Sequence, residues 1–160
     1  MRGKNLSFII AAFAFVLLFG CVSKFEQLQT DMAAKGIKSL TETEIKDAFT
    51  DSSFHGFTRT ARGAVVEYTV YNAIDGTTKG RAWGSWGEDS DTGKWYVNKQ
   101  GQYCSEWFGK WAHDGVRCGV VYPGIDQDEY IEAIVSGKKS KGNPDGIYRF
   151  KLTAGNIEKK

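Results

Sequence analysis

Two histidines are the side chains of this chain best suited to proton transfer near neutral pH. His113 is followed directly by Asp114, and a carboxylate beside an imidazole can orient a general base. His55 precedes a glycine where we expect a loop to end. Adjacent polar side chains on a loop are usually only solvated, and no activated nucleophile accompanies this pair. We therefore predict a protein that is not an enzyme, with a hydrolase that uses His113 and Asp114 as the alternative.

The acidic segment Gly87–Gly93 contains the one pattern that resembles a metal site. Asp89-x-Asp91-x-Gly93 is similar to the start of a calcium-binding loop. It lacks the third ligand, the glycine and the distant glutamate that such a loop needs. No zinc-ligand spacing and no glycine-rich phosphate loop occurs either. We predict an acidic turn at Gly87–Gly93, no metal and no cofactor.

Two of the three cysteines, Cys104 and Cys118, can face each other across a turn. Antiparallel pairing of the two centres that turn on Trp111 and makes residues 109–115 a loop. Directly opposed strand residues have Cβ atoms about 4.5–5.5 Å apart, close to the roughly 3.5–4.5 Å of a disulfide. The bond would close a loop of about 15 residues and stabilise the fold by roughly 3 kcal/mol. Two buried free thiols are the alternative.

The N-terminal segment is typical of an export signal. Arg2 and Lys4 precede an almost wholly apolar run, Leu6–Phe19, which is short for a membrane span of about 20 residues. Leu18-Phe19-Gly20-Cys21 resembles a bacterial lipobox, although Phe19 stands where a small residue is usual. We predict a signal peptide at 1–20 and lipidation of Cys21. Cleavage after Ser23 with simple secretion is the alternative, and an uncleaved anchor is a third.

Cysteine number and charge agree with export to the cell envelope. Two cysteines pair and the third lies where acylation would use it, and disulfides persist in oxidising compartments. The chain has 21 Lys and Arg against 19 Asp and Glu, and the signal removes two of the basic residues. The mature part has no basic excess, so we expect no nucleic-acid partner. We expect a lipid-anchored, periplasm-facing protein, or alternatively a secreted one.

Elements follow from periodicity and capping signals. Residues 21–39 are polar, and we favour a tether there, although Phe25, Leu28 and Met32 form a weak helical stripe. Thr41 and Glu44 form a capping box, which predicts a helix over about 42–50. From there to 156 the pattern predicts six to eight short strands in one domain: an antiparallel meander, mainly β, closed or nearly closed like a small barrel. Strands are expected around residues 66–70, 78–86, 95–97, 102–108, 116–122 and 148–152, with 130–135 either a strand or one helical turn.

Five tryptophans are a high number for one small domain. Strand alternation can bury only some of them, and we favour a tryptophan-rich core. The alternative is that Trp107 and Trp111 are exposed near the disulfide loop and mark a binding surface. The candidate binding surface comprises Trp83, Trp86, Trp107, Trp111 and His113.

Several short motifs follow one another in a characteristic order along the chain. They are Leu40-Thr41-Glu42-Thr43-Glu44, Gly56, Asp75-Gly76, Gly80, Gly93-Lys94-Trp95, Gly101-Gln102-Tyr103-Cys104, Cys118 and Gly155-Asn156. In this order residues 40–156 resemble small bacterial exported proteins of unknown function, which share LT-x-x-E, G-x-W, G-x-x-C and a later cysteine. The resemblance implies an envelope location and a β-rich domain, and it implies no activity.

These observations favour a non-enzymatic envelope lipoprotein whose β domain has a binding or structural role. The expected partners are the membrane, through the N-terminal lipid, and an envelope protein or a small apolar ligand. A secreted, unanchored protein of the virulence or inhibitor type is the alternative, beside the hydrolase considered above.

Overall fold

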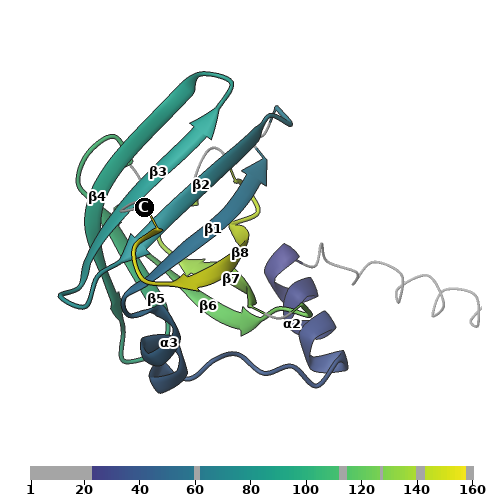
Figure 1. Cartoon of the computed structure of the whole chain (residues 1–160). Coiled ribbons are helices and arrows are strands. Elements are labelled where there is room, and N and C mark those ends of the chain that lie inside the picture. The colour runs from purple at the N-terminus through teal and green to yellow at the C-terminus, as the bar shows by residue number, and fades with distance from the viewer. Residues whose placement is uncertain (1–22, 60–61, 112–114, 127, 140–142, 158–160) are drawn as a thin grey trace, which may run out of the picture.

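The computed structural model describes residues 23–59, 62–111, 115–126, 128–139 and 143–157. Each strand pairs antiparallel with the strands before and after it, and β1 also pairs with β8, so the sheet closes into a barrel (Figure 1). The mainly β, closed antiparallel architecture predicted from the sequence is confirmed. The elements are α2 (Lys24–Ala34), α3 (Glu42–Phe49), β1 (Ser52–Arg59), β2 (Val65–Asn72), β3 (Thr77–Gly84), β4 (Gly87–Val97), β5 (Tyr103–Trp107), β6 (Arg117–Pro123), β7 (Glu129–Ser136) and β8 (Ile147–Ala154).

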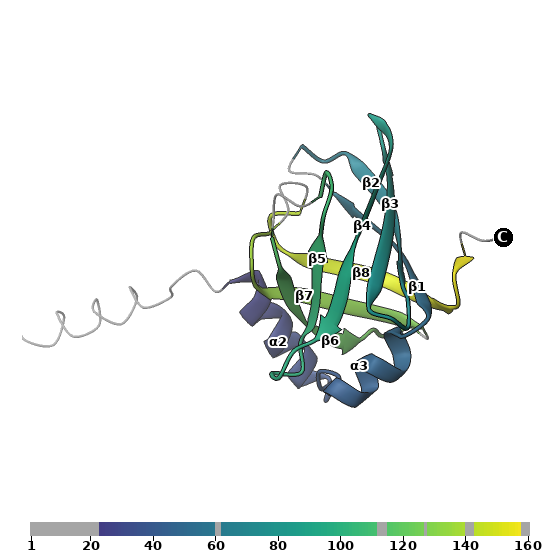
Figure 2. The same cartoon turned by 90° about the vertical axis from the view of Figure 1, so that its left-hand side faces the viewer.

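One end of the barrel is closed by α3, whose Ile45 and Phe49 are completely buried. Figure 2 shows this helix across the lower end, with the β3–β4 hairpin reaching furthest at the opposite end. Alternate strand residues point inward, and those near α3 form an aromatic and aliphatic core against it. That core comprises Phe54, Val70, Trp95, Tyr103, Trp107, Val121 and Phe150.

The capping box predicted for α3 is confirmed. The Thr41 hydroxyl accepts from the backbone N–H of Glu44, and the Glu44 carboxylate accepts from the backbone N–H of Thr41. Leu40 and Ile45 both contact the core, as expected of the hydrophobic pair that flanks such a box. These two contacts fix where the helix begins and how it enters the barrel end.

The segment expected to be a tether is a helix, so that prediction is wrong for residues 24–34. Ser23 caps α2, and Leu28 and Met32 pack on the outer face of β6 and β7. The weak stripe at helical spacing was therefore the correct signal, because burial on the sheet stabilises a helix of low intrinsic amphipathicity. Their partners on the sheet are Tyr122, Ile131 and Ala133. Cys21 and the expected signal peptide lie outside the described residues.

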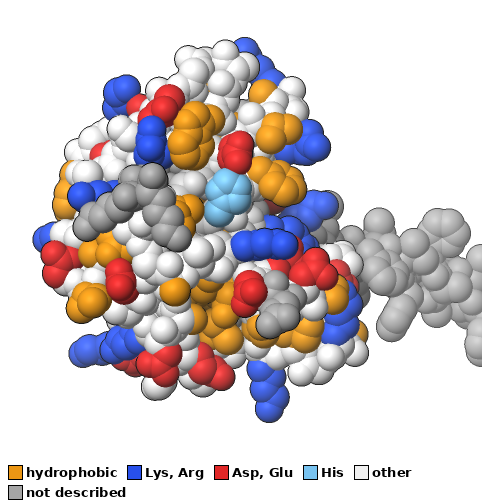
Figure 3. All heavy atoms as spheres, in the orientation of Figure 1, with side chains coloured by type: hydrophobic (Ala, Val, Ile, Leu, Met, Phe, Trp, Pro, Cys, Tyr) orange, Lys and Arg blue, Asp and Glu red, His pale blue; other side chains and the backbone are white. Residues whose placement is uncertain are grey.

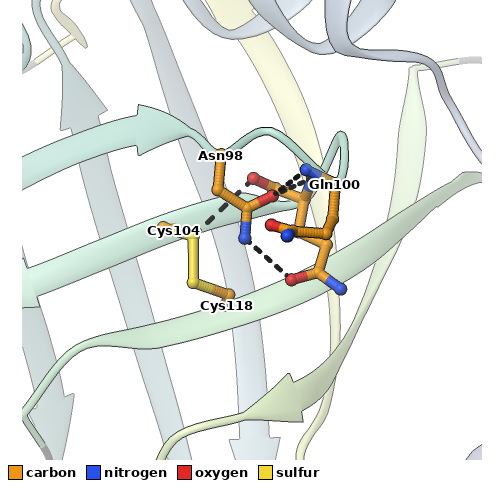
Figure 4. Close-up of a disulfide and its surroundings, with 5 residues drawn as sticks. Asn98, Gln100, Cys104 and Cys118 are labelled. Carbon is orange, nitrogen blue, oxygen red and sulfur yellow. Dashed lines mark hydrogen bonds between the residues drawn. A yellow bond between two sulfur atoms is a disulfide. The ribbon is translucent and has the colours of Figure 1, made fainter.

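The disulfide predicted between Cys104 and Cys118 is confirmed, with an Sγ–Sγ distance of 2.05 Å. The two residues are opposed in the β5–β6 pairing, which is the register that the sequence predicted. Figure 4 shows the bond beside the β4–β5 turn, where the Asn98 side chain accepts from the backbone N–H groups of Gln100 and Gln102. The turn and the disulfide thus hold β4, β5 and β6 together at one place.

Two predictions about strands are wrong. Gly87–Gly93 is the first half of β4 rather than an acidic turn, and the chain turns just before it. His55 lies in the middle of β1 and pairs with Thr69 and Lys151, not at the end of a loop. Both stretches are polar, so apolar alternation was absent although the backbone is extended. Neither helix in the described part of the chain is long and apolar enough to cross a membrane.

Candidate functional site

Beyond the apolar core, the inside of the barrel becomes polar. Five side chains from five strands form what we call the lumenal cluster. The registers place them inward, because each is opposed to other inward positions: Arg117 to Ser105, Glu132 to Val121 and Tyr148, and Tyr68 to Gly56. The members are Tyr68 (β2), Tyr103 (β5), which also belongs to the apolar core, Arg117 (β6), Glu132 (β7) and Tyr148 (β8).

Most of the lumenal cluster is only half-buried, although it points into the barrel. Tyr68, Arg117, Glu132 and Tyr148 keep accessible surface, whereas inward residues of the core such as Phe150 are almost fully enclosed. An inward side chain can expose surface only to the interior or to the open end of the barrel. Eight-stranded barrels are just wide enough to be filled by side chains or to hold one small ligand. Polar inward side chains that keep accessible surface in a barrel of this size make this region a candidate site for one small ligand.

The contacts of Arg117 with other described residues involve one side of its guanidinium. Its Nη1 donates to the Tyr148 hydroxyl at 3.2 Å, and the guanidinium carbon lies 5.8 Å from the centre of the Tyr148 ring. Its Nε is buried and has no hydrogen-bond partner among the described residues. A buried N–H without an acceptor costs about 1–3 kcal/mol. The edge of Arg117 that carries Nε thus has a donor that no described residue satisfies.

Glu132 lies beside Arg117 inside the barrel. A Cβ on Gly119 would overlap the Glu132 side chain, so the glycine provides the space in which this carboxyl lies. Burial raises the pKa of Glu132 from its ordinary value of 4.5 to about 7, and the positive charge of Arg117 opposes the rise. Its carboxyl group therefore changes charge near neutral pH, inside the barrel.

The tyrosines of the lumenal cluster are neutral hydrogen-bonding groups. Burial raises the pKa of Tyr68 and of Tyr103, and the carboxyl of Glu132 adds to both rises. The Tyr68 hydroxyl donates to the backbone carbonyl of Arg149 at 3.3 Å, and its ring meets that of Tyr148 edge-on. The Tyr103 hydroxyl bonds with the buried Asn72 side chain. They give the interior aromatic walls without adding charge.

Two tryptophans cover the β3 side of the interior. Trp107 and Trp111 meet edge-on with ring centres 4.7 Å apart, and a Cβ on Gly80 would overlap both rings. Asp91 holds Trp111 in place, because its carboxylate accepts from the backbone N–H groups of Gly109 at 2.8 Å and of Trp111 at 2.7 Å. Trp107 is only 5% exposed, yet its Nε1 has no partner among the described residues. The interior thus contains a second buried donor without an acceptor.

A separate hollow of about 400 Å³ lies on the outer face of β1, β2 and β8. Its rim includes the exposed Phe57 and Val65, and His55 approaches Glu67 with Nε2 3.2 Å from the carboxylate. Figure 3 shows hydrophobic, acidic and basic side chains gathered around a histidine on this side of the molecule. None of the described side chains that line this hollow has a buried polar atom without a partner.

Of the residues predicted as a binding surface, Trp107 and Trp111 lie together, whereas Trp83 and Trp86 belong to β3 and the turn after it. Trp107 is buried, because it occupies an inward position of β5, and Trp111 is half-buried against it, so the alternative of exposed rings is wrong for Trp107. Trp83 is half-buried, with the Arg81 guanidinium 5.4 Å from its ring centre, and Trp86 is 56% exposed near the β3–β4 turn. His113 and Asp114 lie outside the described residues.

Arg117, Glu132, Tyr68 and Tyr148 were not singled out from the sequence. One signal was available in the stretch Tyr130-Ile131-Glu132-Ala133-Ile134, where a lone carboxylate interrupts apolar residues. A charged residue inside an apolar strand seldom faces a packed core without a partner. The nearby charge, Arg117, lies on a different strand and carries no local sign of its role.

Comparison of the chain with family models, with curated proteins and with solved structures found no match in any of the three.

Proposed function

We propose that this protein is an exported, non-enzymatic binding protein of the cell envelope, anchored by a lipid on Cys21, which takes a small molecule into its barrel. The observation that carries the proposal is the lumenal cluster. Its inward side chains keep accessible surface, and the donors Arg117 Nε and Trp107 Nε1 are buried without acceptors. Ligand sites combine apolar and aromatic walls with a few polar groups that fix orientation, as this interior does.

The closed end of the barrel supports the same proposal. With Ile45 and Phe49 of α3 completely buried there, a ligand would enter from the opposite end. The Cys104–Cys118 bond is compatible with an oxidising compartment, as the proposed export requires. A binding role also needs no nucleophile, and the lumenal cluster contains only tyrosine, arginine and glutamate side chains.

Native mass spectrometry of the full-length protein, purified from envelopes, tests the binding function. We expect a bound small molecule that is released on unfolding, and we expect Arg117→Gln to lose it. Arg149→Gln is the matched control, because Arg149 is exposed on the outer face next to Tyr148 and should leave the bound molecule in place. A ligand retained in Arg117→Gln, or lost equally in both variants, would contradict binding in the barrel.

The anchor is tested independently by the mass of the N-terminal peptide. A diacylglyceryl-modified Cys21 supports it. An unmodified Cys21, or its removal with the signal peptide, would instead support secretion without an anchor and leave the binding proposal intact.

A further inference from the structure

We propose that the molecule held in the barrel is a monocarboxylic acid, bound through its carboxylate by the free edge of Arg117 with Trp107 as a further donor. This inference rests on the proposed function and specifies the ligand class for the same interior. It depends on the hydrogen-bond geometry of Arg117, on the charges around it, and on the position of Trp107.

The geometry of Arg117 favours a planar, two-oxygen acceptor. Arginine presents five N–H donors in a rigid fork, and pairs of parallel N–H groups match a carboxylate. Nη1 is engaged by Tyr148, so the pair formed by Nε and Nη2 is the remaining side-on edge. Nε is already buried and lacks an acceptor among the described residues. A carboxylate on this edge would satisfy it and keep the contact with Tyr148.

The charges in the barrel also favour an anion. Arg117 is half-buried, and a cation that loses part of its hydration is stabilised by a nearby negative charge. The group that contacts Arg117 is the neutral hydroxyl of Tyr148, and no ion pair within 4.0 Å joins it to Glu132 or to another described carboxylate. A single negative charge would complete the site, while a second would meet the carboxyl of Glu132. A monoanion therefore fits better than a dianion or an amine.

Trp107 extends the same site along β5. It follows Ser105 as the next inward residue of that strand, and Ser105 is opposed to Arg117. Its unpartnered Nε1 is a second donor for an acceptor in the interior, and indole nitrogen can only donate. The rings of Tyr68 and Tyr148 offer apolar surface to the remainder of the acid. The carboxylate of an aromatic or aliphatic acid would thus accept hydrogen bonds from these donors, while its apolar part packs against the tyrosine rings.

Binding of an acid beside Glu132 would couple to protonation. Among the described residues, the titratable groups that face Glu132 are Arg117 and the three tyrosines of the lumenal cluster, Tyr68, Tyr103 and Tyr148. Glu132 titrates near pH 7 in the empty barrel, and an anion next to it raises its pKa further. The complex therefore takes up a proton. Affinity should fall with rising pH above neutrality, by up to about tenfold per pH unit.

The test compares phenylacetate with phenylacetamide, its neutral counterpart, by calorimetry and by the indole N–H signals of a nitrogen-15-labelled protein. We expect saturable binding of phenylacetate, a downfield shift of the Trp107 signal, and at least tenfold weaker binding of the amide. Trp107→Phe assigns the signal. Arg117→Gln should lower affinity for the acid by about ten- to a hundredfold, while Arg149→Gln leaves it within about twofold.

A second variant keeps the inference testable should Arg117→Gln fail to fold. Glu132→Gln should bind phenylacetate with an affinity that no longer changes between about pH 6 and pH 8. Equal binding of acid and amide would overturn the carboxylate assignment and leave ligand binding in the barrel standing. Failure of both probes, together with a panel of neutral and cationic aromatics, to shift the Trp107 signal at millimolar concentration would overturn the proposed function as well.

Discussion

Replacing Glu132 with glutamine tests the electrostatic description of the barrel interior most directly. Burial moves the pKa of this carboxyl from 4.5 to about 7. Each pKa unit corresponds to 1.36 kcal/mol of difference between the two charge states, so keeping the ionised form in the barrel costs the fold about 3 kcal/mol. That is an upper value, because Glu132 is half-buried and water in the interior lowers the cost.

Whether stability rises or falls with pH depends on which state, folded or unfolded, binds the proton of Glu132 more tightly. Between about pH 4.5 and pH 7 the folded protein holds the proton on Glu132 and the unfolded chain has lost it, so this group lowers the free energy of unfolding as pH rises. Glutamine resembles the protonated carboxyl and never ionises. Glu132→Gln should therefore match the wild type below about pH 4.5 and exceed it by about 2–3 kcal/mol at pH 8.

Urea unfolding of both proteins, followed by tryptophan fluorescence at several pH values, measures this difference. Glu106→Gln is the control. Glu106 lies on the outer side of β5, so its replacement should leave the pH dependence of the unfolding free energy as it is in the wild type. A difference between wild type and Glu132→Gln that stays constant from pH 4 to pH 8 would refute a carboxyl that titrates inside the barrel. A stability that falls in Glu132→Gln at every pH would instead point to a contact made by the carboxylate.

Three further predictions concern stability. Replacing Cys104 and Cys118 with alanine removes a covalent link between residues 14 apart in the sequence. The unfolding free energy should fall by about 3 kcal/mol and the melting temperature by roughly 6–12 °C. A calorimetric transition at an unchanged temperature would contradict this. Phe49→Ala should cost about 3–5 kcal/mol in urea unfolding, because its ring meets four other rings at 4.7–5.9 Å; a loss below about 1 kcal/mol would show that α3 does not close the barrel. Asp91→Ala should release Trp111 and shift tryptophan emission to longer wavelength at a cost of about 1–3 kcal/mol, whereas emission that stays unchanged would mean that other contacts hold this ring.

Local signals predicted the parts of the fold in which one short pattern determines the structure. The Thr41–Glu44 capping box is complete within four residues, so the start of α3 could be deduced without its surroundings. The spacing of Cys104 and Cys118 likewise determined the β5–β6 register. Strands with one apolar and one polar face, such as β2 and β8, were found by their alternation.

Other elements of the fold are stabilised by contacts with distant residues, which no local sequence pattern predicts. α2 is helical because β6 and β7 offer an apolar outer face, which is a property of distant residues. β1 and the first half of β4 lack apolar alternation, since their inward positions include Gly56, Asp89 and Asp91 near the polar end of the barrel. The polarity that makes this end a candidate site also concealed the strands that build it.

To predict the lumenal cluster from the sequence, one would need to know which face of each strand points inward. β6 and β7 are apolar on both faces, because α2 covers their outer side, so alternation alone cannot place Arg117 or Glu132 inside or outside. A slip of one residue would exchange the two faces and move these charges to the outer side of the barrel. The Cys104–Cys118 bond prevents this, because Cys118 directly follows Arg117 and is tied to β5. The covalent link that stabilises the fold thus also determines that Arg117 faces the interior, and its loss should weaken binding of an acid beyond what the fall in stability explains.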